Sequence, residues 1–276
     1  RRQRQMCIRD RNISKQHLPK KVIHLAAQSG VRHSIENPSE YINSNLVGFG
    51  NVLEFCKDNQ VEHLIYASSS SIYGGNKKVP FSEKDFVEYP LSLYAATKKS
   101  NELIAHSYSH LYSMPIIGLR FFTVYGPWGR PDMAPFIFAD SIFKKKPIKV
   151  FNYGKMSRDF TYIDDVIQTM IKLIDKPAIA NDNFNRENPD PSSSWSPYRI
   201  FNVGNSKKIK LLDFICELET NMGIKAIMHF EKMQKGDVKS TFSDSKNLED
   251  WTGFRPNTSI QFGIKKFVEW YKSYYK

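Results

Sequence analysis

Short apolar runs alternate with helical segments in the first part of this chain, and this alternation limits the fold more than any other feature. Three runs have the length and apolar character of buried strands: residues 22–25, 63–67 and 116–122. Two segments between them have helical character: residues 39–58, which Pro38 opens, and residues 94–112, which Pro115 follows. Strand–helix–strand alternation predicts an α/β fold with a doubly wound, parallel, Rossmann-like sheet.

The pattern changes after residue 124. A loop rich in Gly, Pro and Arg covers residues 125–131, and short strands such as 149–151 and 199–203 then alternate with helices. Residues 178–198 are rich in Asn, Pro and Ser and predict a surface loop, and residues 259–275 predict a last amphipathic helix. We therefore expect a partial Rossmann domain over residues 12–124 and a smaller α/β lobe over residues 125–276.

Composition is consistent with an intracellular globular protein. The 276 residues are 41% hydrophobic, which suits one large α/β domain or two smaller lobes. No run of 18 apolar residues occurs, so we expect no membrane span. The three cysteines, Cys7, Cys56 and Cys216, are odd in number, far apart and without metal-ligand spacing. They indicate a reducing compartment, and we expect a cytoplasmic protein with no metal site.

The formal charge of +12 divides into two parts. Residues 1–11 hold five Arg and one Asp, which gives +4, and residues 6–11 resemble the translation of a common sequencing-adapter end. We expect residues 1–11 to be a non-native segment, with a native basic arm as the alternative. The remaining charge is dispersed, and its densest run, residues 144–146, predicts a solvated helix end or, as a second interpretation, a site for an anionic substrate. No aromatic–basic interleaving occurs, so nucleic acid is not an expected partner.

Tyr94 and Lys98 form a Tyr-x-x-x-Lys pair at the start of the second helical segment. Residues four apart share a helix face, and the ammonium favours the ionised phenolate of a Tyr whose free pKa is about 10. The serine run 68–71, at the end of the second strand, places a hydroxyl beside that phenol. A second match, Tyr73 and Lys77, includes a Gly-Gly-Asn turn, so its side chains would not share a face and Tyr73 is expected to be a packing or rim residue. The first pair predicts an acid–base device for oxidising an alcohol.

Six blocks carry a resemblance to a known family: residues 24–28, 68–74, 94–99, 119–132, 157–162 and 233–238. With them, residues 21–275 resemble the extended short-chain dehydrogenase/reductases of the NAD-dependent epimerase/dehydratase family, and most of all the UDP-glucuronate 4-epimerases. The resemblance implies that Tyr94 removes the proton of the sugar 4-hydroxyl, that Ser69 bonds the same oxygen, and that Lys98 holds the nicotinamide ribose. The C4 hydride passes to NAD and returns to the other face of the 4-keto sugar, so NAD stays bound.

Two positions separate this chain from related enzymes. Nucleotide-sugar dehydratases carry Asp-Glu after the catalytic serine and UDP-glucuronate decarboxylases carry a Glu, whereas this chain has Ser70 and Ser71. A Glu there would repel a substrate carboxylate by about 1–4 kcal/mol at about 4 Å. By resemblance, Thr123 replaces the Asn of UDP-glucose 4-epimerases near the C6 carboxylate, and Arg130 acts on that carboxylate as well. Ordinary turn chemistry is the alternative for the two serines.

The resemblance also implies a nucleotide site. Arg158 would bind the diphosphate bidentately, with an ion pair to Asp159 as the structural alternative. Val150 and Phe151 would contact uracil, and Asp237 would close over the ribose. The implied cofactor contacts, besides Tyr94 and Lys98, are Leu25, Ala26, Ala27, Ser29, Asn45 and Phe122, with Val124 as the alternative to the last.

One family feature is missing from the start of the chain. Nothing in residues 1–20 matches the first strand or the Gly-x-x-Gly-x-x-Gly turn that meets the pyrophosphate. We therefore expect an N-terminally truncated sequence that binds NAD poorly, is inactive by itself and exposes strand edges. By resemblance, the complete protein is a homodimer through helices 39–58 and 92–112. The alternatives are a UDP-glucose or UDP-N-acetylglucosamine 4-epimerase, or a degenerate nucleotide-sugar-binding module that is not an enzyme.

Overall fold

The computed structural model describes residues 17–234 and 236–275, which form two compact units. Unit 1 takes in the chain up to Lys77, then Glu83–Arg120 and Leu173–Phe201, and unit 2 takes in Lys78–Ser82, Phe121–Lys172 and the chain from Asn202 onward. The sequence predicted two contiguous parts that divide at residue 124. The chain instead returns to unit 1 over Leu173–Phe201, because its seventh strand, Tyr198–Val203, pairs into the sheet of unit 1. The expected non-native segment, residues 1–11, lies outside the described residues.

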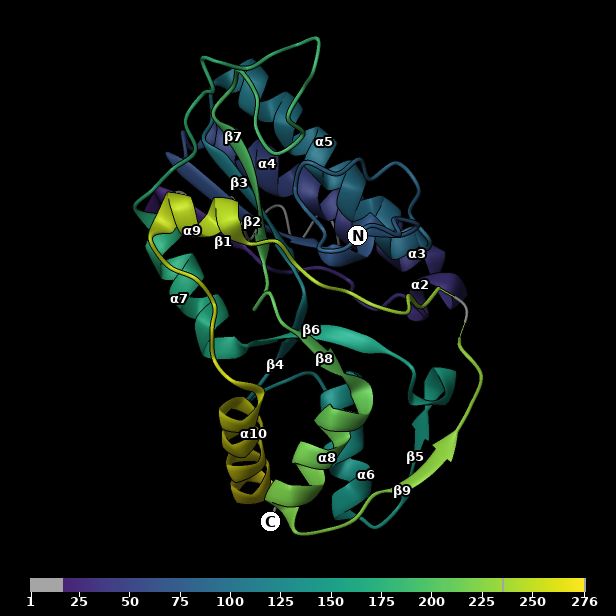
Figure 1. The fold of residues 1–276 in the computed structure, drawn as a ribbon. Helices are drawn as coiled ribbons and strands as arrows, with labels where there is room; N and C mark the ends of the chain where they lie inside the picture. The colour runs from purple at the N-terminus through teal and green to yellow at the C-terminus, as the bar shows by residue number, and fades with distance from the viewer. Residues whose placement is uncertain (1–16, 235, 276) are drawn as a thin grey trace. The chain divides into compact units, whose positions relative to one another are not determined.

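Unit 1 is built on the predicted strand–helix–strand alternation (Figure 1). Its elements in chain order are β1 (Lys21–His24), α2 (His33–Glu36), α3 (Pro38–Tyr41), the π-helical turn η1 (Ile42–Val47), α4 (Gly48–Asp58), β2 (His63–Ser69), the 3₁₀ turn η2 (Ser70–Tyr73), α5 (Leu93–Tyr112), β3 (Ile116–Phe121) and β7 (Tyr198–Val203).

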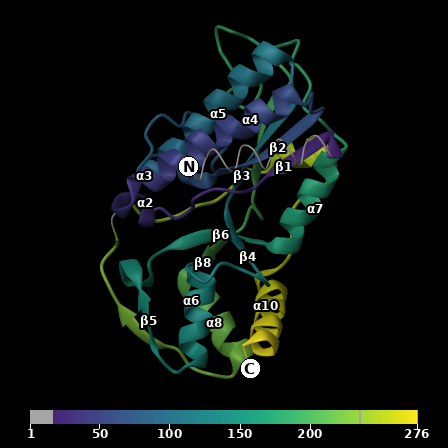
Figure 2. The same cartoon turned by 180° about the vertical axis from the view of Figure 1, so that it is seen from behind.

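The four strands of unit 1 form one sheet in the order β1-β2-β3-β7. β1 and β2 run parallel, with Lys21 opposite His63 and His24 opposite Tyr66. Helices α4 and α5 lie side by side along this sheet in both views (Figures 1 and 2), and α5 packs on β2. The apolar core fills the space between helices and sheet with the buried side chains of Phe49, Leu53, Cys56, Val61, Leu64, Tyr66, Ala105, Met114, Ile116, Tyr198 and Ile200. The predicted parallel α/β sheet is therefore confirmed.

Strand β1 is the outermost of the described strands in this sheet. Its side chains alternate between exposed and half-buried, and Ile23 and the following Leu25 are 39% and 49% exposed. Strand β2, by contrast, is buried almost throughout. Apolar side chains thus remain open to solvent at the β1 edge of the described sheet.

Local signals explain the two helical segments of unit 1. Pro38 occupies the first turn of α3, where its missing N–H would have no helical partner, and the chain stays helical from there to Asp58 through the π-helical turn. Ser92 caps α5 by accepting a hydrogen bond from the Ala95 N–H at 3.1 Å. The left-handed residue Ser113 ends that helix. Both predicted helices are present, and α5 begins one residue before its expected start.

Unit 2 holds two small sheets and five helices among the described residues. Its elements are β4 (Thr123–Tyr125), α6 (Ala134–Phe143), β5 (Pro147–Val150), the 3₁₀ turn η3 (Phe151–Gly154), β6 (Ser157–Tyr162), α7 (Ile163–Ile174), β8 (Lys208–Lys210), α8 (Leu211–Met222), β9 (Ile227–Phe230), α9 (Lys246–Thr252) and α10 (Ile260–Tyr274). The sheets have the orders β4-β6-β8 and β5-β9. Helices α6, α8 and α10 group together, as Figure 2 also shows.

The core of unit 2 is rich in aromatic side chains. Phe160 of β6 stacks on Phe214 of α8 with ring centroids 4.3 Å apart, and Tyr125 lies edge-on to both rings. Helix α10 contributes Phe267 and Tyr271 to the same core. Burial of such rings is the main apolar contribution to the stability of this unit.

Two further expectations concern exposure. Residues 178–197 form no helix or strand, as predicted, but Ser192, Ser193, Ser194 and Ser196 are buried rather than exposed. They turn inward because hydrogen bonds such as Asn181 N–H to the Ser194 carbonyl, at 2.8 Å, fold the loop on itself. No helix formed by residues 17–234 or 236–275 combines the length and hydropathy that a membrane crossing needs.

Candidate active site

The end of β2 and the first turns of α5 carry the predicted acid–base residues, and both elements pack together in unit 1. Ser69 is the last residue of β2 and is 7% exposed. Its Oγ accepts a hydrogen bond from the Ser71 N–H at 3.1 Å and so caps the 3₁₀ turn. A hydroxyl that accepts from the backbone keeps its own proton to donate to a substrate oxygen. Ser70 and Ser71, in the first turn that follows, are half-buried.

Tyr94 is the second residue of α5 and is half-buried. Its ring meets the fully buried ring of Tyr41 edge-on, with centroids 6.1 Å apart. The Tyr41 hydroxyl lies 2.8 Å from the Ser29 carbonyl and 2.6 Å from the Gly30 carbonyl, and its proton is shared between them. Tyr41 therefore supports the Tyr94 ring and also fixes the loop after β1, a role that sequence reasoning missed.

Lys98 lies one turn after Tyr94, as the spacing predicted, and is 3% exposed. Its ammonium donates to the Ala67 carbonyl at 2.8 Å, two residues before Ser69. Burial lowers the pKa of Lys98 to about 8. Burial, and next the charge of Lys98, lower the pKa of His24 to about 4, and the His24 ring stacks on Phe49 with centroids 5.6 Å apart. Lys98 thus presents a buried ammonium next to the end of β2.

The competing pair, Tyr73 and Lys77, does not form a catalytic couple. Tyr73 is 1% exposed, ends the 3₁₀ turn and accepts a hydrogen bond from Arg120. Gly74 follows with φ +39°, and a Cβ there would collide with the Tyr89 carbonyl, so the turn requires glycine. Tyr73 is a packing residue, as expected.

The sequence did not predict the buried ion pair between Glu102, one turn after Lys98 on α5, and Arg120 on β3. The Glu102 carboxylate accepts from Arg120 Nε at 3.0 Å and from Arg120 Nη2 at 2.9 Å, and it also accepts from Ser68 Oγ at 2.6 Å. Glu102 and Arg120 are 3% and 1% exposed. The only available sequence signal was the spacing of Tyr94, Lys98 and Glu102, which places an ionisable group on each of three successive turns of α5.

The expected cofactor residues after β1 lie in a loop of unit 1. Leu25 and Ala26 are exposed, and Ala27 and Ser29 are half-buried. Asn45, in the π-helical turn, is buried, and its side chain accepts from the Gln28 N–H at 2.8 Å and donates to the Gln28 carbonyl at 2.9 Å and to Thr97 Oγ1 at 3.0 Å. Asn45 therefore links the loop backbone to α5 by hydrogen bonds. Its direct contact with a cofactor stays a prediction.

Phe122, Thr123 and Arg130 belong to unit 2. Phe122 is 5% exposed, and its N–H donates to the Val203 carbonyl at 3.2 Å. Thr123 opens β4, is half-buried and lies opposite Phe160 of β6. Arg130 forms a two-bond ion pair with Asp132, at 2.9 and 2.7 Å, on the surface. An action of Arg130 on a sugar carboxylate would require that pair to rearrange.

Arg158 and Asp159 are neighbours on β6 with different surroundings. Asp159 is fully buried, and its carboxylate accepts from the backbone N–H groups of Asn205, Ser206 and Ser243 at 2.8–3.1 Å and from the Ser243 hydroxyl. Arg158 is half-buried, and its Nη1 donates to the Ser157 carbonyl at 2.9 Å and to the Lys239 carbonyl at 3.4 Å. Asp159 thus organises the loops around β6, while Arg158 contacts the chain close to Asp237.

The remaining predicted nucleotide contacts also lie in unit 2. Val150 is fully buried in the core, so it can offer a ligand its backbone rather than its side chain, and Phe151 is half-buried. Asp237 is half-buried, and its N–H donates to the Gln234 carbonyl at 3.4 Å. Among the described residues, no partner meets the buried amide oxygen of Gln234.

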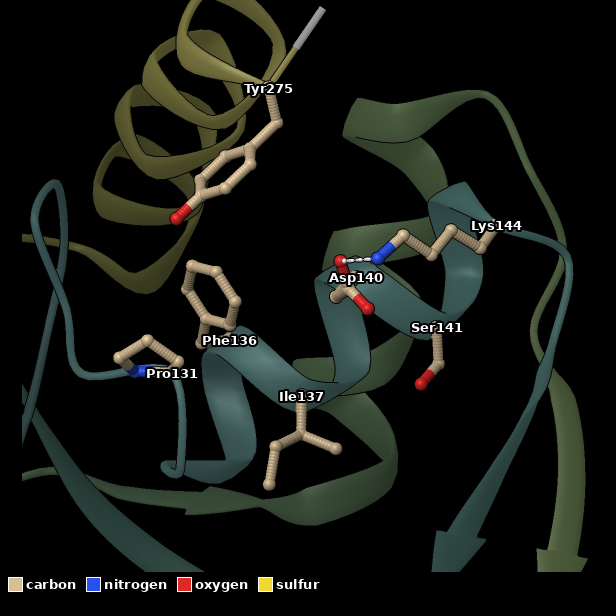
Figure 3. A pocket seen from close by; sticks show the side chains of 7 residues that line it. All are labelled: Pro131, Phe136, Ile137, Asp140, Ser141, Lys144 and Tyr275. Carbon is tan, nitrogen blue, oxygen red and sulfur yellow. Dashed lines mark ion pairs between the residues drawn. The ribbon is translucent and has the colours of Figure 1, made fainter.

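None of the predicted site residues lines a hollow of about 410 Å³ in unit 2 (Figure 3). Its lining comes from helix α6 and its end, from the loop before that helix and from a residue near the C-terminus: Pro131, Phe136, Ile137, Asp140, Ser141, Lys144 and Tyr275. Lys144 forms an ion pair with Asp140 at 2.7 Å, and Lys145 and Lys146 are exposed. The lysine run is therefore a solvated helix end. Within residues 17–234 and 236–275, no cluster of three His, Cys, Asp or Glu could hold a metal ion.

Comparisons with known proteins identify the family. The family model described as "NAD dependent epimerase/dehydratase family" matches residues 5–186. The chain belongs to the NAD-dependent epimerase/dehydratase family. The expected cofactor, NAD, agrees with this membership. A "Probable UDP-glucuronate 4-epimerase" of Rhizobium meliloti is 48% identical over 259 residues, which are 94% of this chain and 76% of that protein.

Two solved structures of the family resemble this chain. The UDP-glucuronic acid 4-epimerase from Bacillus cereus, in complex with UDP-glucuronic acid and NAD, is 30% identical with a TM-score of 0.81, over 95% of this chain and 77% of that one. The UDP-glucose 4-epimerase from Thermotoga maritima, with UDP-glucose, is 25% identical with a TM-score of 0.86, over 98% of this chain and 82% of that one. The likeness confirms the Rossmann-like fold.

Proposed function

We propose that this protein is an NAD-dependent 4-epimerase that interconverts UDP-glucuronate and UDP-galacturonate. The observation that carries the proposal is the packing of α5 against β2. It puts Tyr94 and Lys98 on the helix that packs against the end of the strand carrying Ser69. No carboxylate follows at positions 70 and 71. This arrangement supports reversible oxidation of an alcohol without an extra acid and base for elimination.

The chain's own residues perform the proton chemistry. Tyr94, as phenolate, accepts the proton of the sugar 4-hydroxyl and returns it after the sugar has turned over. Ser69 donates a hydrogen bond to the same oxygen, and the Lys98 ammonium favours the phenolate and would hold the nicotinamide ribose. When bound, NAD supplies the hydride acceptor and then the hydride donor. Leu25, Ala26, Ala27, Ser29 and Asn45 would line its site, since their loop is held against α5.

Three residues support a uronate as the substrate. Ser70 and Ser71 are neutral donors where a carboxylate would repel a sugar acid, and Thr123 replaces the Asn expected for UDP-glucose. The names of the Rhizobium and Bacillus relatives agree with this choice. UDP-glucose and UDP-N-acetylglucosamine remain the alternative substrates.

Residues of unit 2 suit a nucleoside diphosphate. The Arg158 guanidinium now donates to two carbonyls, and phosphate oxygens are stronger acceptors that match its planar fork. The unpartnered amide oxygen of Gln234 and the nearby Asp237 carboxylate add acceptors for uracil or ribose. Val150 and Phe151 would contribute backbone and ring contacts to uracil.

The test uses the protein from the complete reading frame that contains these 276 residues. It is incubated with UDP-glucuronate, UDP-glucose and UDP-N-acetylglucosamine in separate reactions, and the products are separated by anion-exchange chromatography. We expect UDP-galacturonate from UDP-glucuronate, and at least about tenfold lower kcat/KM for the two neutral sugars. Turnover of UDP-glucose alone would overturn the substrate assignment. Binding of UDP-sugars without any turnover would support the degenerate binding module instead.

A further inference from the structure

Four segments of unit 1 meet at the buried pair of Glu102 and Arg120. Glu102 lies on α5, and Arg120 lies on β3. From the end of β2, the Ser68 hydroxyl donates to Glu102 at 2.6 Å. From the turn after β2, the Tyr73 hydroxyl accepts from Arg120 Nη1 at 2.9 Å, and the guanidinium lies 5.0 Å from the centre of the Tyr73 ring. All four residues are buried, with at most 3% of each residue exposed.

Three members of this cluster lie close in sequence to residues of the acid–base site, or one helical turn away from them. Ser68 directly precedes Ser69. Tyr73 ends the turn that Ser69 caps. Glu102 occupies the same face of α5 as Lys98, one turn further on. The Ala67 and Ser68 positions of β2 are therefore bonded in succession to Lys98 and Glu102, and Ser69 is the next residue.

Stability alone does not explain why Glu102 and Arg120 form a buried ion pair. A buried ion pair often contributes no more to stability than well-packed apolar side chains of similar volume. The pair instead fixes the relative orientation of the two side chains. Its two parallel Arg–carboxylate bonds hold the guanidinium and carboxylate planes together and leave Arg120 Nη1 directed at Tyr73. Such a clamp restricts the sliding of β2 along α5.

We propose that Glu102 and Arg120, with Ser68 and Tyr73, are positioning residues that fix Ser69 relative to Tyr94 and Lys98. The inference rests on the proposed 4-epimerase function for its kinetic consequences. A displacement of reacting groups by about 1 Å can cost about a hundredfold in rate. Loss of the clamp should therefore lower kcat more than it changes KM.

Two mild variants test the proposal, each with a matched control in the same unit. S68A removes one hydroxyl from the cluster, and its control is S109A, which removes a buried α5 hydroxyl that has no hydrogen-bond partner among the described residues. Y73F removes the hydroxyl that accepts from Arg120 Nη1, and its control is Y108F, which removes an α5 hydroxyl that donates to Glu54. In the complete protein we expect S68A and Y73F to lower kcat about tenfold or more, with KM within about threefold of wild type. Both controls should stay within about twofold.

A readout without turnover separates this inference from the proposed function. Hydrogen exchange of peptides covering residues 67–73 should become faster in S68A and Y73F, with the melting temperature nearly unchanged, and should stay at wild-type rates in both controls. Wild-type protein that fails to convert any UDP-sugar would contradict the proposed function. In that case the exchange data would still show whether the cluster holds residues 67–73 in place. Unchanged exchange in both variants would overturn the proposal.

A double substitution distinguishes positioning from support of the fold. E102L together with R120M replaces the pair by apolar side chains and leaves no unpaired charge. We expect this variant to fold with a melting temperature close to wild type and still to lose at least about tenfold in kcat. Wild-type kcat in the folded double variant would overturn the proposal, and the two mild variants decide it if the double variant does not fold.

Discussion

Lys98 is the residue whose surroundings most affect the proposed chemistry. Its ammonium is buried against the Ala67 carbonyl, and burial brings its pKa to about 8. A charge with little solvent around it acts on a neighbouring phenol more strongly than an exposed lysine would. Tyr94 is the phenol that the helix spacing puts within its influence.

The first prediction concerns Tyr94. In the complete protein, Y94F should lower kcat about a hundredfold to ten-thousandfold, because general-base catalysis contributes about that much. KM for the UDP-sugar should change far less, since the ring is kept. Product formation followed by chromatography measures both constants, and Y89F, at a tyrosine that is 77% exposed, is the control. Full turnover by Y94F would remove Tyr94 from the mechanism.

A second prediction at this scale concerns acid stability and His24. Its folded pKa, about 4, lies below the ordinary 6.5, so between these values the unfolded chain binds the proton and the folded one does not. Stability contributed by neutral His24 is therefore present above about pH 6.5 and is lost as pH falls towards 4. Urea unfolding at about pH 7 and 4.5 should show wild type losing about 2 kcal/mol more than H24F, which keeps the stack on Phe49. Equal losses would contradict the burial argument.

At the scale of single elements, α5 connects helix formation to the site. Tyr94 occupies its first turn, where fraying begins, and the Ser92 cap opposes that fraying. An equivalent cap, Ser259, begins α10 in unit 2 by accepting from the Phe262 N–H at 3.2 Å. The two serines provide a matched pair for experiment.

The third prediction uses this pair. S92A and S259A should each lower the free energy of unfolding by about 1 kcal/mol in urea titrations. Only S92A should also lower kcat, by about threefold to tenfold, because it loosens the turn that carries Tyr94. Equal kcat values for the two variants would show that the first turn of α5 needs no cap to hold the phenol.

Elements were predictable from the sequence where the signal is local. Ser92, Pro38 and the apolar runs mark helix starts and strands within one or two residues of their observed bounds. The return of residues 173–201 to unit 1 was not predictable, because the partner of a strand such as β7 is chosen by tertiary packing. The spacing of Tyr94 and Lys98 predicted that both residues lie on one helix, one turn apart, as α5 has them. The pairing of Glu102 with Arg120 joins residues on different elements and had no local signature.

At the scale of the whole molecule, we expect the loop after β1 and the first turns of α5 to hold the nicotinamide ribose. The glycine-rich turn that would meet the pyrophosphate is not found in residues 1–20.

The fourth prediction concerns NAD binding by a chain in which that glycine-rich turn is not found. The 276-residue chain expressed by itself should bind NAD at least about tenfold more weakly than the protein from the complete reading frame, which is a loss of about 1.4 kcal/mol or more. It should also show little epimerase turnover. Isothermal titration calorimetry with NAD measures the first quantity, and equal affinities would contradict the prediction.

The fifth prediction concerns self-association through α4 and α5. Leu103 and Leu111 of α5 are 60% and 66% exposed and lie eight residues apart, which is close to one face of the helix. We expect the complete protein to be a homodimer by light scattering, and L103E with L111E to make it monomeric. I179E, at an isoleucine that is also 60% exposed in unit 1, should leave the dimer intact. A monomeric wild-type protein would contradict the proposed dimer.

The placement of Tyr94, Lys98 and Glu102 on successive turns of α5 has a consequence for tolerated sequence change. A substitution alters one side chain, but an insertion or deletion of one residue between positions 94 and 102 rotates every later residue by about 100° around the helix axis. A change between positions 94 and 98 would separate the phenol from both the ammonium and the carboxylate. A change between positions 98 and 102 would separate it from the carboxylate alone. Length variation in related genes should therefore be absent from this helix and common in segments such as residues 178–197, where no regular element would be rotated.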